Sequence, residues 1–583
     1  MDGIFGVLGH DLEDGSLSDT ARVLGSVPKF TLHDPGFALA VCVGGRQATG
    51  AALWAASTDG QLLVAVIGAI EEAAPGRAAQ VALERYERHG AGFVEHLHGF
   101  FAIVVWNARE RRVLLCADRC AGVCGVYYHE GVGGLSFGTA AKAVVALPDV
   151  PRKIDRCALE DMLVLAHPVP PATLFAGVKQ VPAGCMLEAV AGQPPRLMRY
   201  WQRGPNVFRR GGMAEIASDY MAALAAAVTR ASACHSPPAV LLSGGVDSAA
   251  IVALLRAAGH DRIVTYTLDA DENDTSDRDT AARVAALYGT EHRVVALGGA
   301  SSVDALPAIV WHLEMPAPHV HPFFRLCAEV SREHDVVLGG YGNDLVWGIA
   351  WAHSQRAPQV LAGRATRYLA ARRMLDRASV ARLLPGASAT DDKLAERMAG
   401  AVPSNCTDLR EDAIALDEGL FGDQRVMREI GAIATAAHGL WVDSPYSTAN
   451  VVAAAERVPL DARVGTTLTG GLELKAFFKA LADGQRLLPS DIVYRRKQWV
   501  RSPLGAWLRG DLGARIERLI LHGPARDRAL FDLGFVQQLM GAHRSGRADH
   551  GELLTMLAGV ELWQRLFIDP STLVPPDHDI VVG

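Results

Sequence analysis

The sequence predicts two domains, an α+β layered domain followed by an α/β domain with a parallel sheet and large helical additions. Short strand-like segments separated by Gly-containing turns fill the first 200 residues. From about residue 240 the pattern changes to buried strands that alternate with helices. A chain of 583 residues is long enough for two such cores. We place the boundary between residues 1–205 and 206–583, in a stretch rich in Arg, Gly and Pro.

The first domain is predicted from paired strand patterns. Residues 101–106 and 112–116 are apolar runs joined by a polar turn at 107–111, which is typical of two antiparallel neighbours. Helices are predicted at 80–89 and 140–146. Strands and helices in this mixed order favour a layered α+β arrangement.

The second domain is predicted from the alternation of strand and helix after an Ala-rich helix at 213–233. The predicted strands are 239–242, 263–268, 293–297 and 335–338, and the predicted helices between them are 249–258 and 278–287. This order indicates a parallel sheet covered by helices, and such sheets bind ligands at the carboxyl ends of their strands. Beyond Trp347 the pattern is mostly helical.

Composition excludes several classes of protein. Half of the residues are hydrophobic, 21% are charged, and the net charge is −7, so we expect no nucleic-acid or membrane partner. No signal-like leader opens the sequence and no apolar run reaches 18 residues, which predicts a cytoplasmic protein. Nine cysteines, an odd number spread over a long chain, do not describe a disulfide framework.

The segment Leu242-Ser243-Gly244-Gly245-Val246-Asp247-Ser248 is the strongest functional signal. It lies between a predicted strand and a predicted helix, where glycine N–H groups and a helix N-terminus can bind phosphate. The hydroxyls of Ser243 and Ser248 can donate further hydrogen bonds. Asp247 would repel a phosphate unless a cation lies between them. The turn contains no Lys, which excludes the Gly-Lys-Ser/Thr loop of nucleotide hydrolases.

These residues resemble the asparagine synthetase superfamily over nearly the whole chain. Segments 99–102 (GFFA), 117–119 (ADR) and 137–139 (FGT) resemble its N-terminal domain, an Ntn-hydrolase-like (glutaminase-like) sandwich. The segment 242–248 resembles the pyrophosphate loop of its ATP-pyrophosphatase domain, which is adenine nucleotide alpha hydrolase-like. The resemblance implies an ATP-dependent, AMP-forming ligase that makes an amide bond through an acyl-adenylate.

Position 2 departs from the family. Family members carry a nucleophilic Cys after the initiator Met, and this chain carries Asp2. A carboxylate cannot replace a thiolate in forming an acyl-enzyme from glutamine. We therefore predict that the amidotransferase-like domain is inactive, and that the nitrogen nucleophile comes from elsewhere.

Three catalytic residues are implied by resemblance to one branch, the β-lactam synthetases and lasso-peptide macrocyclases. Tyr341 stands where asparagine synthetases carry Glu, and Glu429 precedes Pro445-Tyr446 at a spacing similar to that of the glutamate partner in that branch. Lys497 matches the Arg-x-Lys of the superfamily. A Tyr–Glu dyad could relay the proton of an attacking amine, and Lys497 could stabilise the oxyanion.

The resemblance also implies a nucleotide and metal site. Mg²⁺ is expected on Asp247 and Asp344, and Lys475 is expected to bind pyrophosphate. The expected ATP-binding residues are Leu242, Ser243, Gly244, Gly245, Asp247, Ser248, Leu268, Gly339, Gly340 and Lys475.

Residues 351–423 form additional length that the resembling β-lactam synthetases lack. The stretch is rich in arginine and includes Arg356, Arg364, Arg367, Arg372, Arg373, Arg377 and Arg382. These cations could orient a peptide substrate, or the stretch could be an ordinary helical insertion with a basic solvated face. The first alternative favours a lasso-peptide macrocyclase, which closes an isopeptide (macrolactam) ring between an Asp or Glu side chain and the N-terminal amine of a core peptide. That function implies a precursor peptide, a leader-peptide recognition protein and a leader protease as partners, in antibiotic biosynthesis.

Three alternatives remain open from the sequence. A β-lactam synthetase-like or asparagine-synthetase-like amide-forming ligase would use the same dyad. Synthesis of asparagine from free ammonia conflicts with Tyr341 in place of Glu. A catalytically silent binding protein conflicts with the presence of Asp247, Asp344 and Lys497 together.

Overall fold

The computed structural model describes most of the chain in two parts that share one core. The described residues are 2–9, 11–12, 15–43, 53–119, 124–202, 212–233, 237–269, 276–317, 322–347, 364–403, 412, 415–416, 420, 431–463, 465–466, 472–495 and 503–576. The predicted boundary at 205/206 and most of the stretch 203–212 lie outside them. The first part ends with a strand at Arg196–Arg199, and the second part begins with a helix at Met213.

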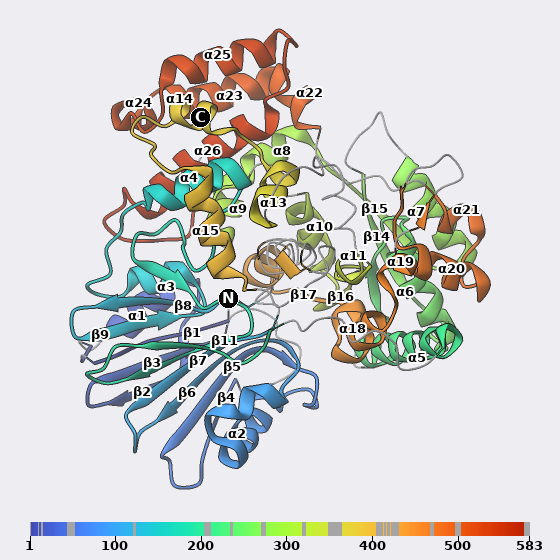
Figure 1. The fold of residues 1–583 in the computed structure, drawn as a ribbon, viewed down its shortest axis with the longest axis horizontal. Helices are drawn as coiled ribbons and strands as arrows, with labels where there is room; N and C mark the ends of the chain where they lie inside the picture. Colours follow the sequence, from blue (N-terminus) through green and yellow to red (C-terminus); the bar gives the residue numbers. More distant parts are fainter. Residues whose placement is uncertain are drawn as a thin grey trace.

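The N-terminal part is a sandwich of two sheets (Figure 1). One sheet has the order β10-β8-β9-β1-β3-β2, and the other has the order β12-β11-β7-β6-β5-β4. Their bounds are β1 (Gly3–Leu8), β2 (Pro28–Asp34), β3 (Phe37–Cys42), β4 (Trp54–Ala56), β5 (Leu62–Ile70), β6 (Gly99–Asn107), β7 (Arg112–Ala117), β8 (Tyr127–Gly131), β9 (Gly134–Gly138), β10 (Val178–Gln180), β11 (Cys185–Val190) and β12 (Arg196–Arg199). The helical elements are α1 (Ser16–Val23), α2 (Ala78–His89), η1 (Gly90–His96), α3 (Ala141–Ala146) and α4 (Arg156–Leu165).

Alternating residues of β6 explain why the sandwich has layers. Ala102, Val104 and Trp106 point into the core between the two sheets. Ile103 and Val105 pack on the opposite face, against α2 and η1. Successive side chains of a strand point to opposite faces, and a strand that is apolar at every position is therefore buried on both.

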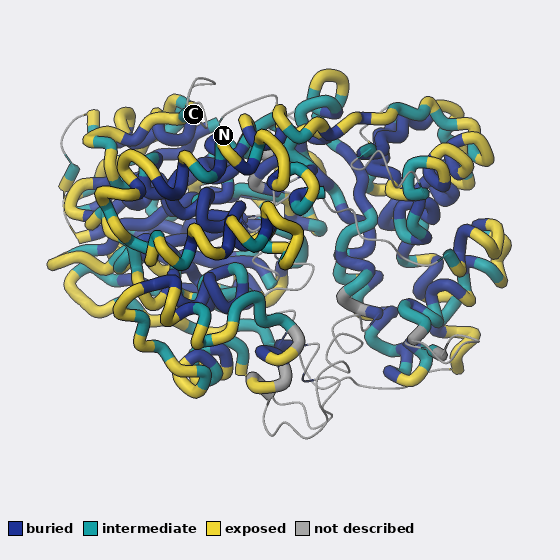
Figure 2. Tube along the Cα trace, turned by 90° about the horizontal axis from the view of Figure 1, so that it is seen from above, coloured by how far each residue is buried: buried dark blue, intermediate teal, exposed yellow. Residues whose placement is uncertain are grey.

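The second part contains a five-stranded parallel sheet of order β15-β14-β13-β16-β17. The strands are β13 (Ala239–Leu241), β14 (Val264–Asp269), β15 (Glu291–Ala296), β16 (Val336–Leu338) and β17 (Trp441–Asp443), with a small hairpin of β18 (Gly465–Thr466) and β19 (Leu472–Glu473). Figure 2 shows the buried trace inside a layer of half-buried and exposed helices. The sheet and the predicted strands agree, except that the sequence pattern did not predict β17.

Helices cover both faces of this sheet. Val240 and Leu242 face a core formed with α5, α6, α18 and α20, whereas Ala239 and Leu241 face the core shared with α9, α10 and α26. The helical elements are α5 (Met213–Ser232), α6 (Val246–Ala257), α7 (Ser276–Tyr288), α8 (Gly299–Asp304), α9 (Leu306–Leu313), α10 (Phe323–Val330), α11 (Asn343–Val346), α13 (Arg364–Arg372), α14 (Arg377–Leu383), α15 (Asp391–Ala401), η2 (Ala432–Ala437), η3 (Pro445–Ser447), α18 (Ala449–Glu456), α19 (Leu460–Arg463), α20 (Ala476–Gly484), α21 (Ser490–Val493), α22 (Leu504–Arg509), α23 (Asp511–Leu521), α24 (Pro524–Arg528), α25 (Leu533–Arg544) and α26 (Gly551–Phe567).

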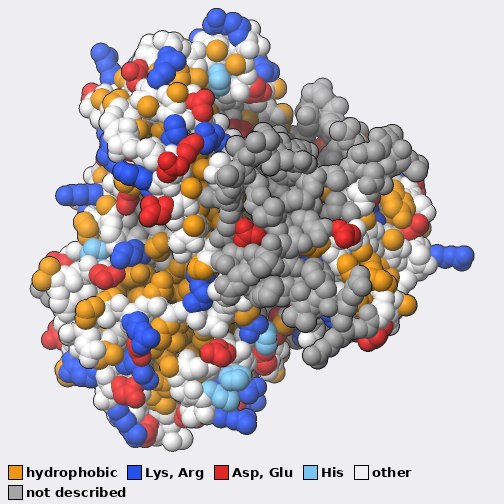
Figure 3. All heavy atoms as spheres, in the orientation of Figure 1, with side chains coloured by type: hydrophobic (Ala, Val, Ile, Leu, Met, Phe, Trp, Pro, Cys, Tyr) orange, Lys and Arg blue, Asp and Glu red, His pale blue; other side chains and the backbone are white. Residues whose placement is uncertain are grey.

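The two parts pack against each other through a continuous apolar core. Phe175 of the N-terminal part lies against Trp563 and Phe567 of α26, with ring centroids 4.7 and 5.3 Å away. Basic and acidic side chains are interspersed over the described portion of the face drawn in Figure 3. Within the described part of the chain, none of the helices has the length and hydrophobicity needed to span a bilayer.

Candidate active site

The Ser-Gly-Gly loop lies at the carboxyl end of β13 and leads into α6. Its tight turn requires glycine at position 244, where φ is +70° and a Cβ would lie 2.8 Å from the carbonyl oxygen of Asp277. The Ser243 N–H donates to the hydroxyl of Ser248 at 3.1 Å. This bond closes the turn, and α6 begins at Val246, earlier than predicted, so that Asp247 and Ser248 lie in its first turn.

The turn after β16 packs directly on this loop. A Cβ at Gly340 would lie 3.0 Å from the Cβ of Asp247 and 3.1 Å from the Ser248 nitrogen. Because residue 340 is glycine, residues 339–344 can lie directly against the Ser-Gly-Gly loop and the first turn of α6. The two expected site segments, which lie almost a hundred residues apart in sequence, form one site.

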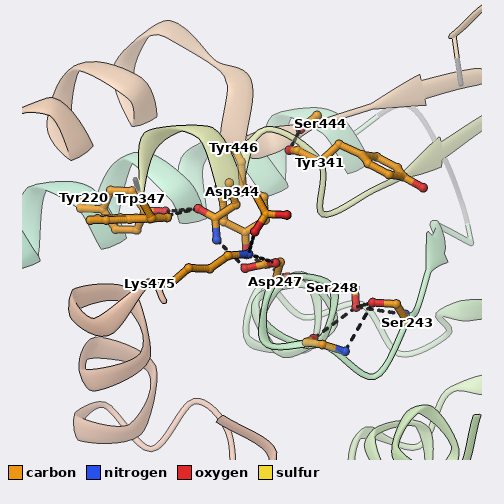
Figure 4. Close-up of polar contacts among 12 residues, drawn as sticks. Tyr220, Ser243, Asp247, Ser248, Tyr341, Asp344, Trp347, Ser444, Tyr446 and Lys475 are labelled. Carbon is orange, nitrogen blue, oxygen red and sulfur yellow. Dashed lines mark hydrogen bonds and ion pairs between the residues drawn. The ribbon is translucent and has the colours of Figure 1, made fainter. Parts of the chain in front are cut away.

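A buried lysine joins the two expected metal-binding carboxylates (Figure 4). The Lys475 Nζ contacts Asp247, and it lies 2.5 Å from Asp344 Oδ1. Burial alone would lower the pKa of Lys475, but the two carboxylates outweigh it and raise that pKa above its usual value. Lys475 is therefore a fixed positive charge between two negative ones.

An amide and three aromatic side chains orient Asp247. Asn343 Nδ2 donates to Asp247 Oδ1 at 2.6 Å, and Tyr446 donates its hydroxyl to the Asp247 carbonyl at 2.8 Å. The side-chain oxygen Oδ1 of Asn343 accepts from Trp347 Nε1 at 2.6 Å and from the Tyr220 hydroxyl at 3.2 Å. Burial raises the pKa of Tyr220 and Tyr446, which keeps both hydroxyls protonated as donors. None of these four residues was expected from the sequence to belong to the site.

Tyr341 lies at the same edge of the sheet, and its ring points away from the Lys475 cluster in Figure 4. Ser444 donates its hydroxyl to the Tyr341 carbonyl. The ring of Phe323 meets the Tyr341 ring edge-on, with centroids 5.7 Å apart. The Tyr341 ring, which carries the hydroxyl group, is therefore held in place by the hydrogen bond to the Tyr341 backbone and by the contact with the Phe323 ring.

The two leucines of the expected ATP site lie at strand ends. The Leu242 side chain is buried in the core, its N–H donates to the Tyr266 carbonyl at 2.8 Å, and its carbonyl accepts from Thr267 Oγ1 at 2.5 Å. Leu268 is buried in the core on the opposite face of the sheet. Leu242 therefore supports the sheet beneath the loop, with both of its backbone groups already bonded.

Two of the expected catalytic residues, Glu429 and Lys497, lie outside the described residues. Among the residues that the structure does describe, no group of three or more His, Cys, Asp and Glu side chains could hold a metal ion by itself. Asp247 and Asp344 are a converging pair, and phosphate oxygens would have to supply further ligands to a cation held there.

Comparison with known proteins agrees with this geometry. The asparagine synthase family model matches residues 219–565, and the glutamine amidotransferase domain model matches residues 77–201. The chain belongs to the asparagine synthase family.

Relatives in this family are moderately similar. A Mycobacterium tuberculosis (strain ATCC 25618 / H37Rv) protein, provisionally named a glutamine-hydrolyzing asparagine synthetase, is 26% identical over 84% of this chain and 80% of its own length. Asparagine synthetase (glutamine-hydrolyzing) 3 of Bacillus subtilis is 27% identical over 47% of each chain. A solved structure titled as the allosteric regulatory enzyme of purine biosynthesis is 12% identical, with a TM-score of 0.25, over 50% of this chain and 80% of that one. As a member of the asparagine synthase family, the chain is an ATP-dependent, AMP-forming amide-bond ligase.

Asp2, at the position where the resemblance implies the family's glutaminase nucleophile, lies next to β1. Its neighbour Gly3 pairs with Cys42 of β3 in the sheet register. Burial raises the pKa of the Cys42 thiol to about 12, so this thiol stays protonated at neutral pH. A protonated, buried thiol is a poor substitute for the missing nucleophile.

Three arginines of the insertion, Arg373, Arg377 and Arg382, contact other groups of the protein. Arg373 and Arg377 both bind Asp391, with 3.0 Å between Arg377 Nε and Asp391 Oδ1. Arg382 lies over the ring of Phe535, 4.1 Å from its centroid. Arg356 lies outside the described residues, as does the rest of 351–363. Arg373, Arg377 and Arg382 are therefore engaged by the protein itself, which differs both from a surface that orients a peptide and from a solvated basic face.

Proposed function

We propose that this ligase adenylates a carboxylate substrate and joins it to an amine that binds directly, without ammonia from glutamine. The observation that carries the proposal is Asp2 at the position of the family's nucleophile, in a chain that keeps Asp247, Asp344 and Lys475 in contact. Tyr341 in place of the asparagine synthetase glutamate supports the same proposal.

The first step makes the acyl-adenylate from ATP, which is a substrate. A carboxylate oxygen attacks the α-phosphorus, and the bond to the leaving pyrophosphate breaks. The loop N–H groups and the hydroxyls of Ser243 and Ser248 would bind the leaving phosphates. The buried ammonium group of Lys475 would stabilise the negative charge of the leaving phosphates. Asp247 and Asp344 would hold Mg²⁺, which would neutralise phosphate charge. In this structure both carboxylates contact the ammonium group of Lys475, and two carboxylates that converge on one positive charge fit that role.

The second step forms the amide. The amine nitrogen attacks the acyl carbon, AMP leaves, and one proton must leave the nitrogen. An unperturbed Tyr hydroxyl titrates near ~10, so Tyr341 needs Glu429 as the final acceptor of this proton. Lys497 would stabilise the oxyanion.

A narrower version of the proposal is lasso-peptide macrocyclisation. Its support is the resemblance of Tyr341 and its flanking glycines to the branch that uses an amine of the same molecule. In that version the partners are a precursor peptide, a leader-recognition protein and a leader protease. The described insertion arginines add no support, because Arg373, Arg377 and Arg382 already contact other groups of the protein.

The test uses the full chain, ATP, Mg²⁺ and labelled pyrophosphate with three acid panels: β-amino acids, aspartate with ammonium, and synthetic Asp- or Glu-containing core peptides. Acid-dependent pyrophosphate exchange, followed by a product one water lighter and AMP, is expected from one panel. Tyr341→Phe should keep the exchange and lose the product, whereas Asp247→Asn should lose both. Release of glutamate from glutamine coupled to amide formation would contradict the proposal.

A further inference from the structure

Glu71 of the N-terminal part binds two helices of the second part. It follows β5, and its own N–H donates to the His98 carbonyl at 2.9 Å, which fixes it to the N-terminal part. Its carboxylate accepts from the Ala449 N–H, with 3.1 Å to Oε1 and 3.3 Å to Oε2. Ala449 is the first residue of α18. The Glu71 side chain is only 18% exposed, and its Oε2 lies 3.8 Å from Nη2 of Arg230, in α5, which lies beside α18 in Figure 1.

The carboxylate of Glu71 supplies a cap that α18 does not make for itself. The first N–H groups of a helix have no partner within the helix, and a Ser or Thr just before it often binds one of them. Thr448 occupies that position here, but its hydroxyl donates to the Pro445 carbonyl at 3.0 Å. Glu71 accepts from the helix instead, and its negative charge is favourable at the positive end of the helix dipole.

The turn just before α18 belongs to the candidate active site. Residues 444–448 lead into the helix and include η3. Tyr446 donates its hydroxyl to the Asp247 carbonyl at 2.8 Å, and Ser444 donates its hydroxyl to the Tyr341 carbonyl (Figure 4). Both donors are completely buried. The turn therefore holds the backbones of the phosphate-loop carboxylate and of the expected catalytic tyrosine.

The bonded N–H of Ala449 is only three residues from Tyr446, so a shift at the start of α18 moves the turn as well. We propose that Glu71 is a positioning residue, which through its bond to Ala449 holds the 444–448 turn against Asp247. This proposal rests on the proposed function, in which Asp247 holds Mg²⁺ on ATP. It gives the amidotransferase-like part a role in the ligase reaction that needs no glutamine.

The neighbouring residue Glu72 provides a matched control. Its carboxylate binds His98 within the N-terminal part, with 2.6 Å between Oε1 and Nδ1. Removing either acid changes the net charge equally at adjacent positions, so a general electrostatic effect on ATP would appear in both variants. Glu71→Gln tests the bond apart from the charge, because it keeps the shape of the side chain and an acceptor oxygen for the Ala449 N–H.

The first measurement is the Kd of the full chain for α,β-methylene-ATP with Mg²⁺, a probe that cannot release pyrophosphate. Glu71→Met should raise this Kd about 3- to 10-fold, up to the full free energy of a helix cap. Glu71→Gln should fall between Glu71→Met and the parent protein, and Glu72→Met should keep the parent Kd. In the Tyr446→Phe background, Glu71→Met should add little, because it acts through the same turn.

Three results would overturn the proposal. The first is an equal rise of Kd in Glu71→Met and Glu72→Met. The second is a pair of effects, from Glu71→Met and Tyr446→Phe, that simply multiply in the double variant. The third is a Glu71→Gln protein that binds the probe as weakly as Glu71→Met, since the bond to Ala449 would then not be what matters.

Hydrogen exchange of residues 444–452 gives a readout that needs no ligand. Exchange there should be about 5- to 10-fold faster in Glu71→Met and unchanged in Glu72→Met. Unchanged exchange in Glu71→Met would also overturn the proposal. A parent protein that shows this exchange pattern but does not bind the probe would reject the proposed function, and with it the role toward ATP, while Glu71 would stand as the cap of α18.

Discussion

At the scale of single residues, the space for the Tyr341 ring depends on the absence of a side chain at position 339. A Cβ on Gly339 would lie 2.5 Å from Cδ2 and 2.6 Å from Cε2 of that ring. Contacts this short force the ring or the backbone to move. The Tyr341 ring therefore occupies the space that a side chain at position 339 would fill.

We expect Gly339→Ala to impair the second step more than the first. The methyl group displaces the Tyr341 ring from Phe323, so amide formation should fall at least tenfold while acid-dependent pyrophosphate exchange persists. The measurement is the ratio of product formed to pyrophosphate exchanged. Gly541→Ala, in α25, is the control, because nothing lies within 4 Å of the added Cβ. Equal loss of both steps in Gly339→Ala would contradict this explanation.

The sequence could predict the loop residues of the site but not the network behind them. Ser243, Asp247 and Asp344 belong to short segments with a characteristic pattern. Trp347 is only four residues from Asn343, but Tyr220, which binds the same amide oxygen, is 123 residues away, and no local spacing indicates that contact. Lys475 was expected from resemblance, but only the fold shows that both carboxylates converge on it.

At the scale of elements, the insertion is held to the N-terminal part by buried polar contacts. Arg397 of α15 binds Asp161 of α4, with 3.0 Å between Arg397 Nε and Asp161 Oδ2. Glu160 accepts from the N–H groups of Ser388 and Ala389 at 3.2 and 2.8 Å. Asp161 is only 1% exposed, and burial raises its pKa although Arg397 opposes this.

We therefore predict that Arg397→Met costs about 3–5 kcal/mol of unfolding free energy, because it leaves a buried carboxylate without its cation. Urea denaturation of the purified variants would measure this. Adding Asp161→Leu should recover most of the loss. Arg262→Met, which breaks an exposed pair with Glu291, should cost less than about 1 kcal/mol. Equal losses in Arg397→Met and Arg262→Met would show that the insertion is not held at α4.

Another polar side chain, His438, packs against an aromatic ring just after the π-helical turn η2. His438 follows this turn and lies edge-on to Phe324, with ring centroids 4.8 Å apart. Burial lowers the pKa of His438 to about 4. The folded protein thus favours the neutral imidazole, whereas the unfolded chain takes up a proton near pH ~6.5.

This shift predicts a loss of stability in mild acid. The contribution of neutral His438 to the free energy of unfolding is fully present above pH ~6.5. This contribution decreases as the pH falls toward ~4, by up to about 3 kcal/mol. In His438→Phe, which keeps the ring packing and removes the titration, the pH dependence of the unfolding free energy should be shallower over that window. An identical slope in the parent and the variant would place the acid sensitivity elsewhere.

Elements with a clear apolar pattern could be predicted from sequence, including the short strands β13 and β16, whereas β17 could not. The helix α5 and the strands β6 and β7 lie where their apolar patterns indicated. The strand β17 has only three residues, too few to show a period of two, and it exists because Val336–Leu338 offers it a parallel partner. The docking of the insertion depends on Asp161, more than two hundred residues away, and has no local signal.

At the scale of the whole molecule, the N-terminal part contributes a buried lysine to the interface between the parts. Lys142 of α3 is fully buried, and its Nζ donates to the Trp311 carbonyl at 3.0 Å and lies 3.4 Å from Glu314 Oε1. Glu314 also accepts from the Ala141 N–H at 2.7 Å, and its carbonyl accepts from Trp563 Nε1 at 2.9 Å. Glu314, which directly follows α9, therefore binds α3 through its carboxylate and α26 through its backbone carbonyl.

This arrangement gives a physical reason to keep an amidotransferase-like domain under the proposed function. Asp2 removes the nucleophile, but removing the domain would expose the apolar core around Phe175 and Trp563 and leave Glu314 without Lys142. Burial lowers the pKa of Lys142, and the carboxylate of Glu314 opposes that shift. The stability of the ligase domain should therefore depend on a pair whose two members come from different parts.

We predict that Lys142→Met lowers the unfolding free energy by about 3–5 kcal/mol, because Glu314 is left buried with an unpaired charge. The lost contact is one of those that couple the parts, so we expect a single calorimetric transition in the parent and two separate transitions in the variant. Combining Lys142→Met with Glu314→Gln should restore part of the midpoint, since both charges are then absent. Lys179→Met, which breaks an exposed pair with Glu130 inside the N-terminal part, should leave one transition near the parent midpoint. A single unchanged transition in Lys142→Met would mean that apolar contacts such as Phe175–Trp563 hold the two parts together without the ion pair.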